Sequence, residues 1–418
     1  MEQNYSKLLE KSLSAARLSL LHLVADEATR NNLPLYIVGG AVRDLILGGH
    51  LNDFDLTIEG DAIKLARSLA SRHGGAVTAH TKFGTAKWFL PGSLKSDMET
   101  HDTLDLVSAR SETYKHPAAL PTVKLGTIID DLRRRDFTIN ALAIRLDGAH
   151  FGELRDDLND MDDLHKGIVR VLHPRSFLDD PTRLYRAVRY EARYGFRIAE
   201  DTLALIPEAR GFIDKLSPQR IRHELDLILE EPNAAAMLLR LDELDLLAPI
   251  HPALANFSQS NLATLKSDDP ALKNRNSRWL LWLMDLTDQE IEFLNKRLHF
   301  TADLLKMLRS AALINANLAA IVGLKPSQAV ELLEGYSPKA LEVVSSAVPD
   351  KEIRNILTKY LSEWWHVRPK TTGHDLKKRD IPPGPKYTEI LRRLRAAWLD
   401  GEVKTEEEEK KMLDDLLI

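Results

Sequence analysis

The sequence has no cysteine, no long hydrophobic run and no excess of positive charge, and each absence narrows its function. Without cysteine the chain forms no disulfide and no thiolate-bound zinc site, which agrees with a reducing cytoplasm. No apolar stretch reaches the roughly 20 residues of a membrane-spanning helix. Residues 1–32 carry acids and lysines on a helical period and do not resemble a signal peptide. The sequence therefore predicts a soluble, cytoplasmic protein with no membrane partner, and it implies no protein partner.

Acidic and basic residues nearly balance. There are 62 Asp and Glu against 57 Lys and Arg, which gives a formal net charge of −5 at pH 7. The whole chain therefore does not indicate nucleic-acid binding, and such a role needs local basic surface. The chain has 418 residues, of which 44% are hydrophobic and 28% charged, and this predicts a globular protein with several structural units.

The pattern of apolar residues changes near residue 170. Before it, a helix is predicted between Asp61 as N-cap and Gly74 at its end. Short apolar runs in the same part predict strands over 33–38, 52–58, 85–90, 104–109 and 141–146. After Val171 the sequence predicts helices over 181–194, 201–208, 217–230, 233–245, 260–266, 276–297, 301–316, 326–335, 338–347, 351–363 and 384–399. The fold class is therefore α+β, with a small mixed sheet followed by an all-α part, and residues 368–385 are predicted as a loop.

Two glycines and two acids stand close together early in the chain. Asp53 and Asp55 are two apart in a predicted strand, so their side chains point to the same face. Paired carboxylates repel one another unless they bind a hard cation such as Mg²⁺, which also takes phosphate oxygens. Gly39 and Gly40 precede a predicted helix, whose first N–H groups can bind a phosphate. Alone, the glycines are usual in a turn and the aspartates on a solvated strand; together they favour a site for a triphosphate and a metal.

Several stretches carry a resemblance to a known family. GGAVRD from Gly39, followed by DFDL from Asp53, resembles the nucleotidyltransferase superfamily. RRRDFTINALAI (133–144), DDPTRLYRAVRYEARYGFRI (179–198) and LSPQRIRHELDLIL (216–229) resemble, in order, motifs of class II tRNA CCA-adding enzymes and their poly(A) polymerase relatives. The resemblance covers about residues 30–250. It implies a catalytic nucleotidyltransferase head over 1–150, a base-selecting neck over 151–235, a helical body over 236–367 and a tRNA-binding helical tail over 368–418.

The resemblance implies that Asp53 and Asp55 are catalytic and hold Mg²⁺. A further catalytic acid from a neighbouring strand is expected in the superfamily, and Asp105 is the candidate. The alternative is that Asp105 is an ordinary acid at a sheet edge.

A second set of residues is expected to bind the nucleotide. Arginines suit phosphate oxygens, and an aspartate can accept a hydrogen bond from a ribose hydroxyl. The alternative for the segment 134–140 is a salt-bridged helix start with Asp136 as its cap. The expected nucleotide-binding residues are Gly39, Gly40, Arg43, Arg134, Arg135, Asp136, Asn140, Asp180, Arg183, Arg186 and Arg189.

Within that set, Asp180 and Arg183 resemble the family's base-selecting pair. The carboxylate accepts from the exocyclic amine of cytosine or adenine, and the guanidinium donates to the adjacent ring nitrogen. Uracil would leave buried polar groups unpaired, at a cost of roughly 1–3 kcal/mol per group. The alternative is that Asp180, which precedes Pro181, caps the following helix. Asp179 stands where the family usually has Glu.

Two other segments bear on the activity. Residues 109–132 resemble the family's flexible loop, and their full length favours a chain that adds A, since members that add only CC have it shortened. At the junction between head and neck, residues 156–170 lack the proline and both glycines of the usual family segment. The chain thus departs from the family at a place that could act as a hinge.

Basic residues concentrate between Arg368 and Arg395, where the acids of the segment are Asp375, Asp380 and Glu389. The local excess of positive charge suits contacts with a phosphate backbone. The alternative is a solvated helix face. The expected RNA-binding residues are Lys377, Lys378, Arg379, Lys386, Arg392 and Arg393.

These features together predict an enzyme that adds CCA to the 3′ end of tRNA. It would use CTP and ATP without a nucleic-acid template, bind Mg²⁺ and release pyrophosphate. The alternatives within the class are an enzyme that adds only A or only CC, or a poly(A) polymerase. Outside the class, the alternative is a non-catalytic RNA-binding module, which would have no need for clustered carboxylates.

Overall fold

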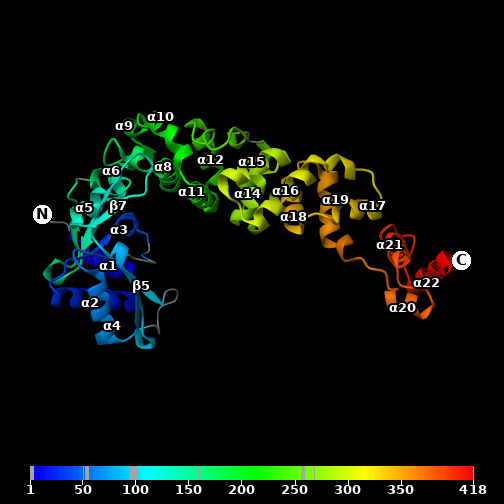
Figure 1. Ribbon diagram of the computed structural model, residues 1–418, viewed down its shortest axis with the longest axis horizontal. Coiled ribbons are helices and arrows are strands. Elements are labelled where there is room, and N and C mark those ends of the chain that lie inside the picture. Colours follow the sequence, from blue (N-terminus) through cyan, green and yellow to red (C-terminus); the bar gives the residue numbers. More distant parts are fainter. Residues whose placement is uncertain are drawn as a thin grey trace. The chain divides into compact units, whose positions relative to one another are not determined.

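The chain folds into two compact units (Figure 1). A computed structural model describes residues 4–49, 51, 56–94, 102–158, 160–255, 259–267 and 269–417. The first unit contains Met1–Leu216 with Leu244–Pro249, and the second contains Ser217–Glu243 with Ile250–Ile418. The prediction of four domains, 1–150, 151–235, 236–367 and 368–418, stays a prediction.

The first unit is built on a mixed sheet of seven strands within the described residues, in the order β3-β4-β5-β2-β1-β8-β9. β2 and β5 are parallel, and the other neighbours are antiparallel. The strands are β1 (Leu35–Val38), β2 (Leu56–Ile58), β3 (Ala76–His80), β4 (Thr85–Phe89), β5 (Thr103–Ser108), β8 (Ala143–Arg145) and β9 (Glu153–Arg155). Separate two-stranded sheets are formed by β6 (Arg110–Thr113) with β7 (Thr122–Leu125), and by β10 (Ile168–Val169) with β11 (Arg197–Ile198). The predicted α+β class with a small mixed sheet is confirmed.

The first unit also contains helices within its described residues. They are α1 (Ser6–Ser12), α2 (Ala15–Arg30), α3 (Gly40–Ile46), α4 (Ala62–His73), α5 (Ile128–Arg133), α6 (Met161–Lys166), α7 (Ser176–Asp179), α8 (Thr182–Tyr194), α9 (Glu200–Leu203) and α10 (Ile206–Ala209). α4 has the predicted ends, because the side chain of Asp61 accepts a hydrogen bond from the N–H of Lys64 at 3.0 Å and Gly74 follows with φ +86°. Its buried face packs on β3, β4 and β5.

One hydrophobic cluster supports the segment from residue 134 to residue 140. Residues of β1 and β8 pack there against α5, with Tyr36, Val38, Ile128, Leu132 and Ala143 among the buried members. Because α5 ends at Arg133 directly above this core, the polar residues that follow it are held in fixed positions.

The second unit is helical throughout its described residues. Its helices are α11 (Pro218–Glu230), α12 (Ala234–Glu243), α13 (Gln259–Leu265), α14 (Arg275–Leu283), α15 (Asp288–Leu298), α16 (Ala302–Ala316), α17 (Pro326–Leu333), α18 (Pro338–Ala347), α19 (Lys351–Ser362), α20 (Gly373–Lys378), α21 (Pro385–Leu399) and α22 (Glu406–Leu417). The single helix predicted over 276–297 is wrong: a capping box of Thr287 and Glu290 starts a second helix there. The predicted loop 368–385 contains α20, which a capping box of Thr372 and Asp375 starts.

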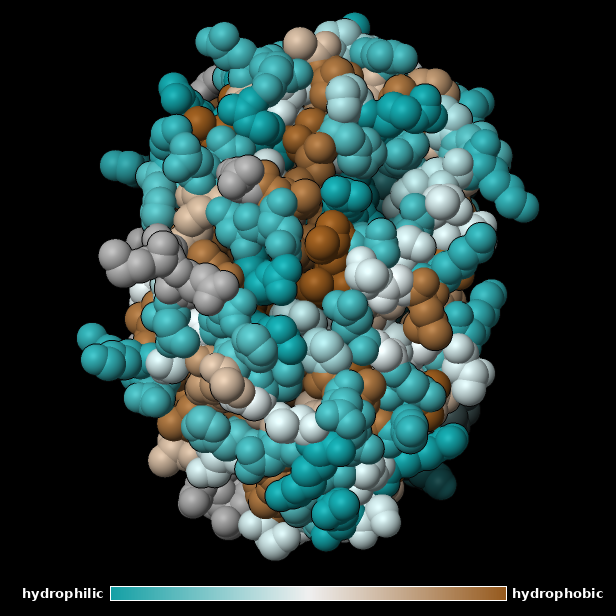
Figure 2. Space-filling model, turned by 90° about the vertical axis from the view of Figure 1, so that its left-hand side faces the viewer, coloured by the Kyte–Doolittle hydropathy of each residue, from teal (hydrophilic) through white to brown (hydrophobic). Residues whose placement is uncertain are grey.

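The surface in Figure 2 is mostly hydrophilic, with hydrophobic residues interspersed. This distribution fits a chain whose large apolar side chains lie mainly in its cores. In the portion of the chain that the structure describes, no helix combines the length and the apolar character needed to cross a bilayer.

Glu409 of α22 fixes the C-terminal helix to the rest of its unit. Its carboxylate is 1% exposed and accepts hydrogen bonds from the backbone N–H of Lys370 (2.9 Å) and Thr371 (2.6 Å) and from the indole N–H of Trp398. Burial by itself raises the pKa of Glu409, but these donors hold it below its usual value.

Replacing Glu409 by glutamine is expected to destabilise this region by about 1–3 kcal/mol, because the three donors lose a charged acceptor. Thermal unfolding and limited proteolysis of residues 370–417 measure the effect. Glu407→Gln, on the exposed side of the same helix, is the control. Since the folded-state pKa is lowered, the difference between wild type and Glu409→Gln should shrink as the pH falls below about 4. An equal difference at pH 3 and pH 7 would contradict this explanation.

Candidate active site

At the turn between β1 and α3, the side chain of Arg135 packs closely against the backbone of Gly39. Gly39 has φ +70°, and a Cβ at this position would lie 2.2 Å from Nη1 of Arg135. Another residue would therefore suffer both backbone strain and a clash with a guanidinium. Glycine at position 39 lets Arg135 lie against the start of α3, as the strand–glycine–helix pattern requires for an anion site.

The two arginines after α5 are held by one buried acid. The carboxylate of Asp131 is fully buried and binds Arg134 at 2.7 Å and Arg135 at 2.9 Å. Burial raises the pKa of Asp131, but the two guanidinium groups outweigh it and lower the pKa below its usual value. Asp131 therefore stays ionised and fixes the direction of both arginines.

Asp136 is the centre of a second buried network. Its carboxylate accepts hydrogen bonds from Nε of Arg186 (2.7 Å), Nδ2 of Asn140 (2.8 Å) and the N–H of Phe137 (2.9 Å). Although burial raises the pKa of Asp136, Arg186 and Asn140 hold it below its usual value. The alternative interpretation expected a salt-bridged helix cap. The structure has the salt bridge, but its partner comes from α8, and the residue that precedes the 3₁₀ turn Thr138–Asn140 is Phe137.

Asp180 and Arg183 each have partners of their own. Oδ1 of Asp180 accepts from the N–H and the hydroxyl of Thr182, at 3.0 Å and 2.6 Å. This is the bond that the capping alternative expects, since Thr182 begins α8. The guanidinium of Arg183, 6% exposed as a residue, donates to Oγ of Ser176 at 2.6 Å and to the backbone oxygen of Arg134 at 2.8 Å. The roles of the two residues in base selection stay predictions.

These networks meet in one polar pocket of about 300 Å³ in the first unit. Most of the expected nucleotide-binding residues line it, and four residues that the sequence did not single out line it as well. The lining residues are Gly40, Glu112, Tyr114, Arg134, Arg135, Asp136, Asn140, Asp180, Thr182, Arg183, Arg186 and Tyr190. Thr182, Arg186 and Tyr190 are four apart on α8, so helical spacing could have revealed two of the four.

Arg43 and Arg189 have other surroundings. The guanidinium of Arg43 is buried, lies 4.5 Å from the ring centre of Tyr194 and 5.1 Å from that of Tyr190, and donates to Asn140 and to Asp44. Arg189 is 7% exposed and lies 5.6 Å from the ring centre of Tyr190. Both arginines pack against Tyr190, which lines the pocket, but neither lines the pocket itself. A direct contact of Arg43 or Arg189 with the nucleotide stays a prediction.

The comparison with known proteins gives the family. Residues 35–170 match the family described as "Poly A polymerase head domain", and residues 195–258 match "Probable RNA and SrmB- binding site of polymerase A". An A-adding tRNA nucleotidyltransferase from Halalkalibacterium halodurans is 31% identical to this chain. The alignment covers 97% of this chain and 94% of that relative. The chain belongs to the tRNA nucleotidyltransferase and poly(A) polymerase family.

This family member has further relatives of known structure or activity. An A-adding tRNA nucleotidyltransferase from Geobacter sulfurreducens is 35% identical over 97% of the chain, which spans about half (48%) of that relative. A CC-adding enzyme from Deinococcus radiodurans is 39% identical over 50% of the chain and 53% of its own length. A solved CCA-adding enzyme in an apo form aligns over 99% of both chains, with 29% identity and a TM-score of 0.85. The Thermotoga maritima CCA-adding enzyme complexed with tRNA aligns over 100% of this chain and 99% of its own, with 28% identity and a TM-score of 0.81.

Of the three acids predicted to be catalytic in this nucleotidyltransferase, Asp105 lies among the described residues. Asp53 and Asp55 lie outside the described residues. Asp105 lies on β5, is 44% exposed, and forms a 3.1 Å ion pair with Lys87 on β4. β5 lies between β4 and β2 and is therefore not an edge strand. The alternative that Asp105 is an acid at a sheet edge is wrong. A catalytic role for Asp105 stays a prediction.

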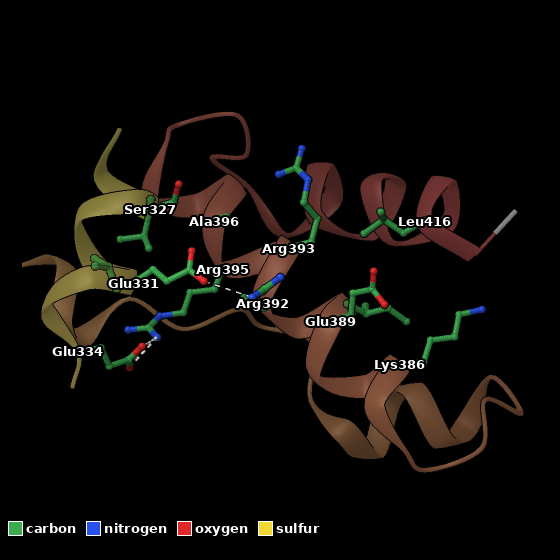
Figure 3. A pocket seen from close by; sticks show the side chains of 13 residues that line it. Ser327, Glu331, Glu334, Lys386, Glu389, Arg392, Arg393, Arg395, Ala396 and Leu416 are labelled. Carbon is green, nitrogen blue, oxygen red and sulfur yellow. Dashed lines mark hydrogen bonds and ion pairs between the residues drawn. The ribbon is translucent and has the colours of Figure 1, made fainter. Parts of the chain in front are cut away.

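The basic residues of the tail region face more acids than the sequence segment contains. Arg392 binds Glu331 on α17 (3.2 Å), and Arg395 binds Glu334, which directly follows α17 (2.8 Å); Figure 3 shows both pairs. Two further arginines pair with acids after α21: Arg393 with Glu402 at 2.7 Å, and Arg379 with Asp414. Acids outside 368–395 therefore reduce the local excess of positive charge. Lys386 extends away from α17 in Figure 3, and the RNA-binding role of the six residues stays a prediction.

Asp160 lies at the junction that departs from the family pattern. The residue is 4% exposed, and burial together with Asp156 and Asp163 raises the pKa of its carboxyl to about 7. It lines a cavity of about 560 Å³ with Arg133 and His173.

Replacing Asp160 by asparagine is expected to stabilise the protein at pH 8 and to change little at pH 4. The folded protein keeps the proton up to about pH 7 while the unfolded chain loses it near pH 4, so ionisation costs stability as the pH rises through this window. After allowance for solvent screening, the gain is on the order of 1–2 kcal/mol. Thermal unfolding at both pH values measures it, with the exposed Asp162→Asn as control. A gain of the same size at pH 4 would contradict the assignment of the proton.

Proposed function

We propose that this chain transfers AMP from ATP to the 3′ end of tRNA that ends in CC, with release of pyrophosphate. The pocket between α5 and α8 carries this proposal, because it gathers arginines for phosphates and the Asp180/Arg183 pair for a base. Two relatives that each match 97% of the chain are A-adding enzymes, which favours adenosine as the added nucleotide.

The reaction forms one bond and breaks one. The 3′-hydroxyl oxygen of the tRNA bonds to the α-phosphorus of ATP, and the bond from that phosphorus to the oxygen bridging to the β-phosphate breaks. The electron pair leaves with pyrophosphate, and the attacking hydroxyl loses its proton. A site for this transfer needs fixed positive charge around the triphosphate and fixed hydrogen-bonding groups around the base.

The described residues supply both. Arg134 and Arg135, fixed by Asp131, line the pocket and are the proposed ligands of the phosphates. Asp180 accepts from the N6 amine of adenine and Arg183 donates to N1. Arg183 keeps its position through Ser176 and the backbone of Arg134.

Mg²⁺ fits the donor chemistry of this site. Its ligands would be the carboxylates of Asp53 and Asp55, with that of Asp105 as a third candidate. Asp105 stands one residue before Leu106, which pairs with Leu56, the first described residue after the two acids. When bound, the metal supplies positive charge to the triphosphate and lowers the pKa of the attacking hydroxyl.

Three tRNA substrates test the proposal: one without the CCA end, one ending in C and one ending in CC. Each is incubated with ATP or with CTP, and the products are resolved at single-nucleotide length. Addition of one A to the CC-ended tRNA, and of nothing else, is the expected result. Repeated addition of A would instead indicate a poly(A) polymerase.

Addition of the full CCA end is the second candidate function. The solved CCA-adding enzymes align with the chain from end to end, and the chemistry of Asp180 and Arg183 suits cytosine as well as adenine. Incorporation of two C from CTP on the tRNA without CCA, followed by A, would establish it.

The proposal includes RNA contacts by the tail. Lys377 and Lys386 are the two expected RNA-binding residues to change first, since the arginines have acidic partners. The double variant Lys377→Ala/Lys386→Ala is expected to weaken tRNA binding and to reduce the salt slope by about 1 for each lost phosphate contact. Lys359→Ala, on α19, is the control. An unchanged salt slope would contradict the contact.

A further inference from the structure

The hairpin formed by β6 and β7 supplies one wall of the nucleotide pocket. Glu112, on β6, and Tyr114, directly after it, line the pocket together with Asp180 and Arg183. The hairpin is also fixed to the segment that leads to Asp180, because the N–H of Ala118 donates to the backbone oxygen of Leu178 at 3.0 Å. The hairpin, which lies outside the seven-stranded sheet, therefore lines the pocket with Glu112 and Tyr114 and is bonded next to it through Ala118.

Glu112 joins three donors at this wall. Its carboxylate is 8% exposed and accepts from Nη2 of Arg110, Nη1 of Arg134 and the hydroxyl of Tyr114, each at 3.1 Å. A buried carboxylate with three donors holds each of them in one direction. Of the three, Arg134 and Tyr114 line the nucleotide pocket.

The network continues from Glu112 to the guanidinium of Arg183. Glu112 holds the side chain of Arg134, and the backbone oxygen of Arg134 accepts from Nη2 of Arg183 at 2.8 Å. The phenol of Tyr114 lies in the electrostatic range of both Asp180 and Arg183. Burial raises the pKa of Tyr114 to about 12, with Glu112 and Asp180 acting in the same direction and Arg183 against them, so the phenol remains a neutral donor. The hairpin thus lines the same pocket as both members of the pair to which the proposed function gives base selection.

We propose that Glu112 is a positioning residue for nucleotide selection, acting through Arg134, and that Tyr114 borders the base of the incoming nucleotide. Glu112 keeps the Arg134 guanidinium at the pocket and the backbone of residue 134 under Arg183, so that Arg183 meets a base nitrogen without rearrangement. This inference rests on the proposed function, because the nucleotide is the occupant that it assumes.

Two conservative variants test the proposal in the full-length protein. Glu112→Gln keeps the size of the side chain but removes its charge, and Tyr114→Phe removes only the hydroxyl. Glu153→Gln, which changes a glutamate of β9 at the end of the sheet, is the matched control. The measurements are kcat and KM for ATP on CC-ended tRNA, the ratio of A to C incorporation, the Kd of ATP without tRNA, and Tm.

Glu112→Gln is expected to raise KM for ATP about tenfold and to lower the A-to-C ratio, with a Tm close to that of the wild type. Tyr114→Phe is expected to lower the same ratio two- to fivefold. If Glu112 acts through Arg134, its substitution should have little further effect on KM in an Arg134→Met background. Values of KM, Kd and selectivity equal to those of Glu153→Gln would overturn the proposal, and so would a loss of activity that follows Tm alone.

The Kd for ATP separates this inference from the proposed function. If wild-type protein adds no nucleotide to tRNA but Glu112→Gln still weakens ATP binding, the proposed reaction fails and the positioning role stands. If the wild type adds A and both variants select nucleotides as the control does, the reaction stands and the positioning role fails.

Discussion

Asparagine at position 53 or 55 is expected to lower the rate of A addition by at least about a thousandfold, the largest effect of any single change in this chain. Each substitution removes a negative charge from the pair that the sequence assigns to Mg²⁺, while the size of the side chain is kept. The arginines predicted to bind the phosphates are untouched, so the Kd of ATP measured without metal should remain within a few-fold of the wild-type value. Single-turnover kinetics with CC-ended tRNA and an ATP-binding titration measure the two quantities.

Asp26→Asn is the control for this experiment, because Asp26 is an exposed acid on α2 that is not among the predicted site residues. Asp105→Asn in the same series decides whether a third acid takes part: a loss as large as that of Asp53→Asn assigns it to the site, and a loss of less than tenfold leaves it as the partner of Lys87. Full turnover by the Asp53 and Asp55 variants would refute the metal-dependent mechanism.

Local sequence patterns predicted those parts of the fold that depend on local interactions. The helix α4 has the expected cap at Asp61 and the expected glycine end, and the helices α8, α11 and α16 lie within one residue of their predicted ranges. Strand β3 was not predicted. Its residues are alternately exposed and half-buried and include two alanines, so it has no clear apolar run. It is held by pairing with β4, which a local pattern does not show.

Only part of the candidate site could be predicted from the sequence. The family resemblance pointed to Arg134, Asp136 and Arg183, which the structure brings into one pocket. Glu112 could not be found in this way, because its importance comes from a bond to Arg134, 22 residues further along the chain. The tail shows the reverse case: the charge of Arg395 was visible in the sequence, but its partner Glu334 is 61 residues away, and pairing removes much of the apparent basic excess.

Replacing Asp136 by asparagine is expected to cost about 2–4 kcal/mol of folding free energy and to raise KM for ATP at least tenfold. The buried carboxylate binds Arg186 and Asn140 at once, and its loss leaves the Arg186 guanidinium facing an amide in the pocket. Denaturant unfolding and steady-state kinetics measure the two effects. Asp201→Asn, which breaks an exposed ion pair with Arg170, should cost less than about 1 kcal/mol.

The pH dependence of the Asp136 variant follows from the sign of its pKa shift. The pKa of Asp136 is lowered in the folded protein, so its contribution is complete above the unfolded pKa near 4 and disappears as the pH falls further. The stability difference should therefore shrink between pH 5 and pH 3. In an Arg186→Met background, Asp136→Asn should cost less than it does alone, since the charge that it leaves unpaired is absent. Additive losses would show that Asp136 acts through Asn140 and Phe137, and that the ion pair with α8 does not hold the pocket together.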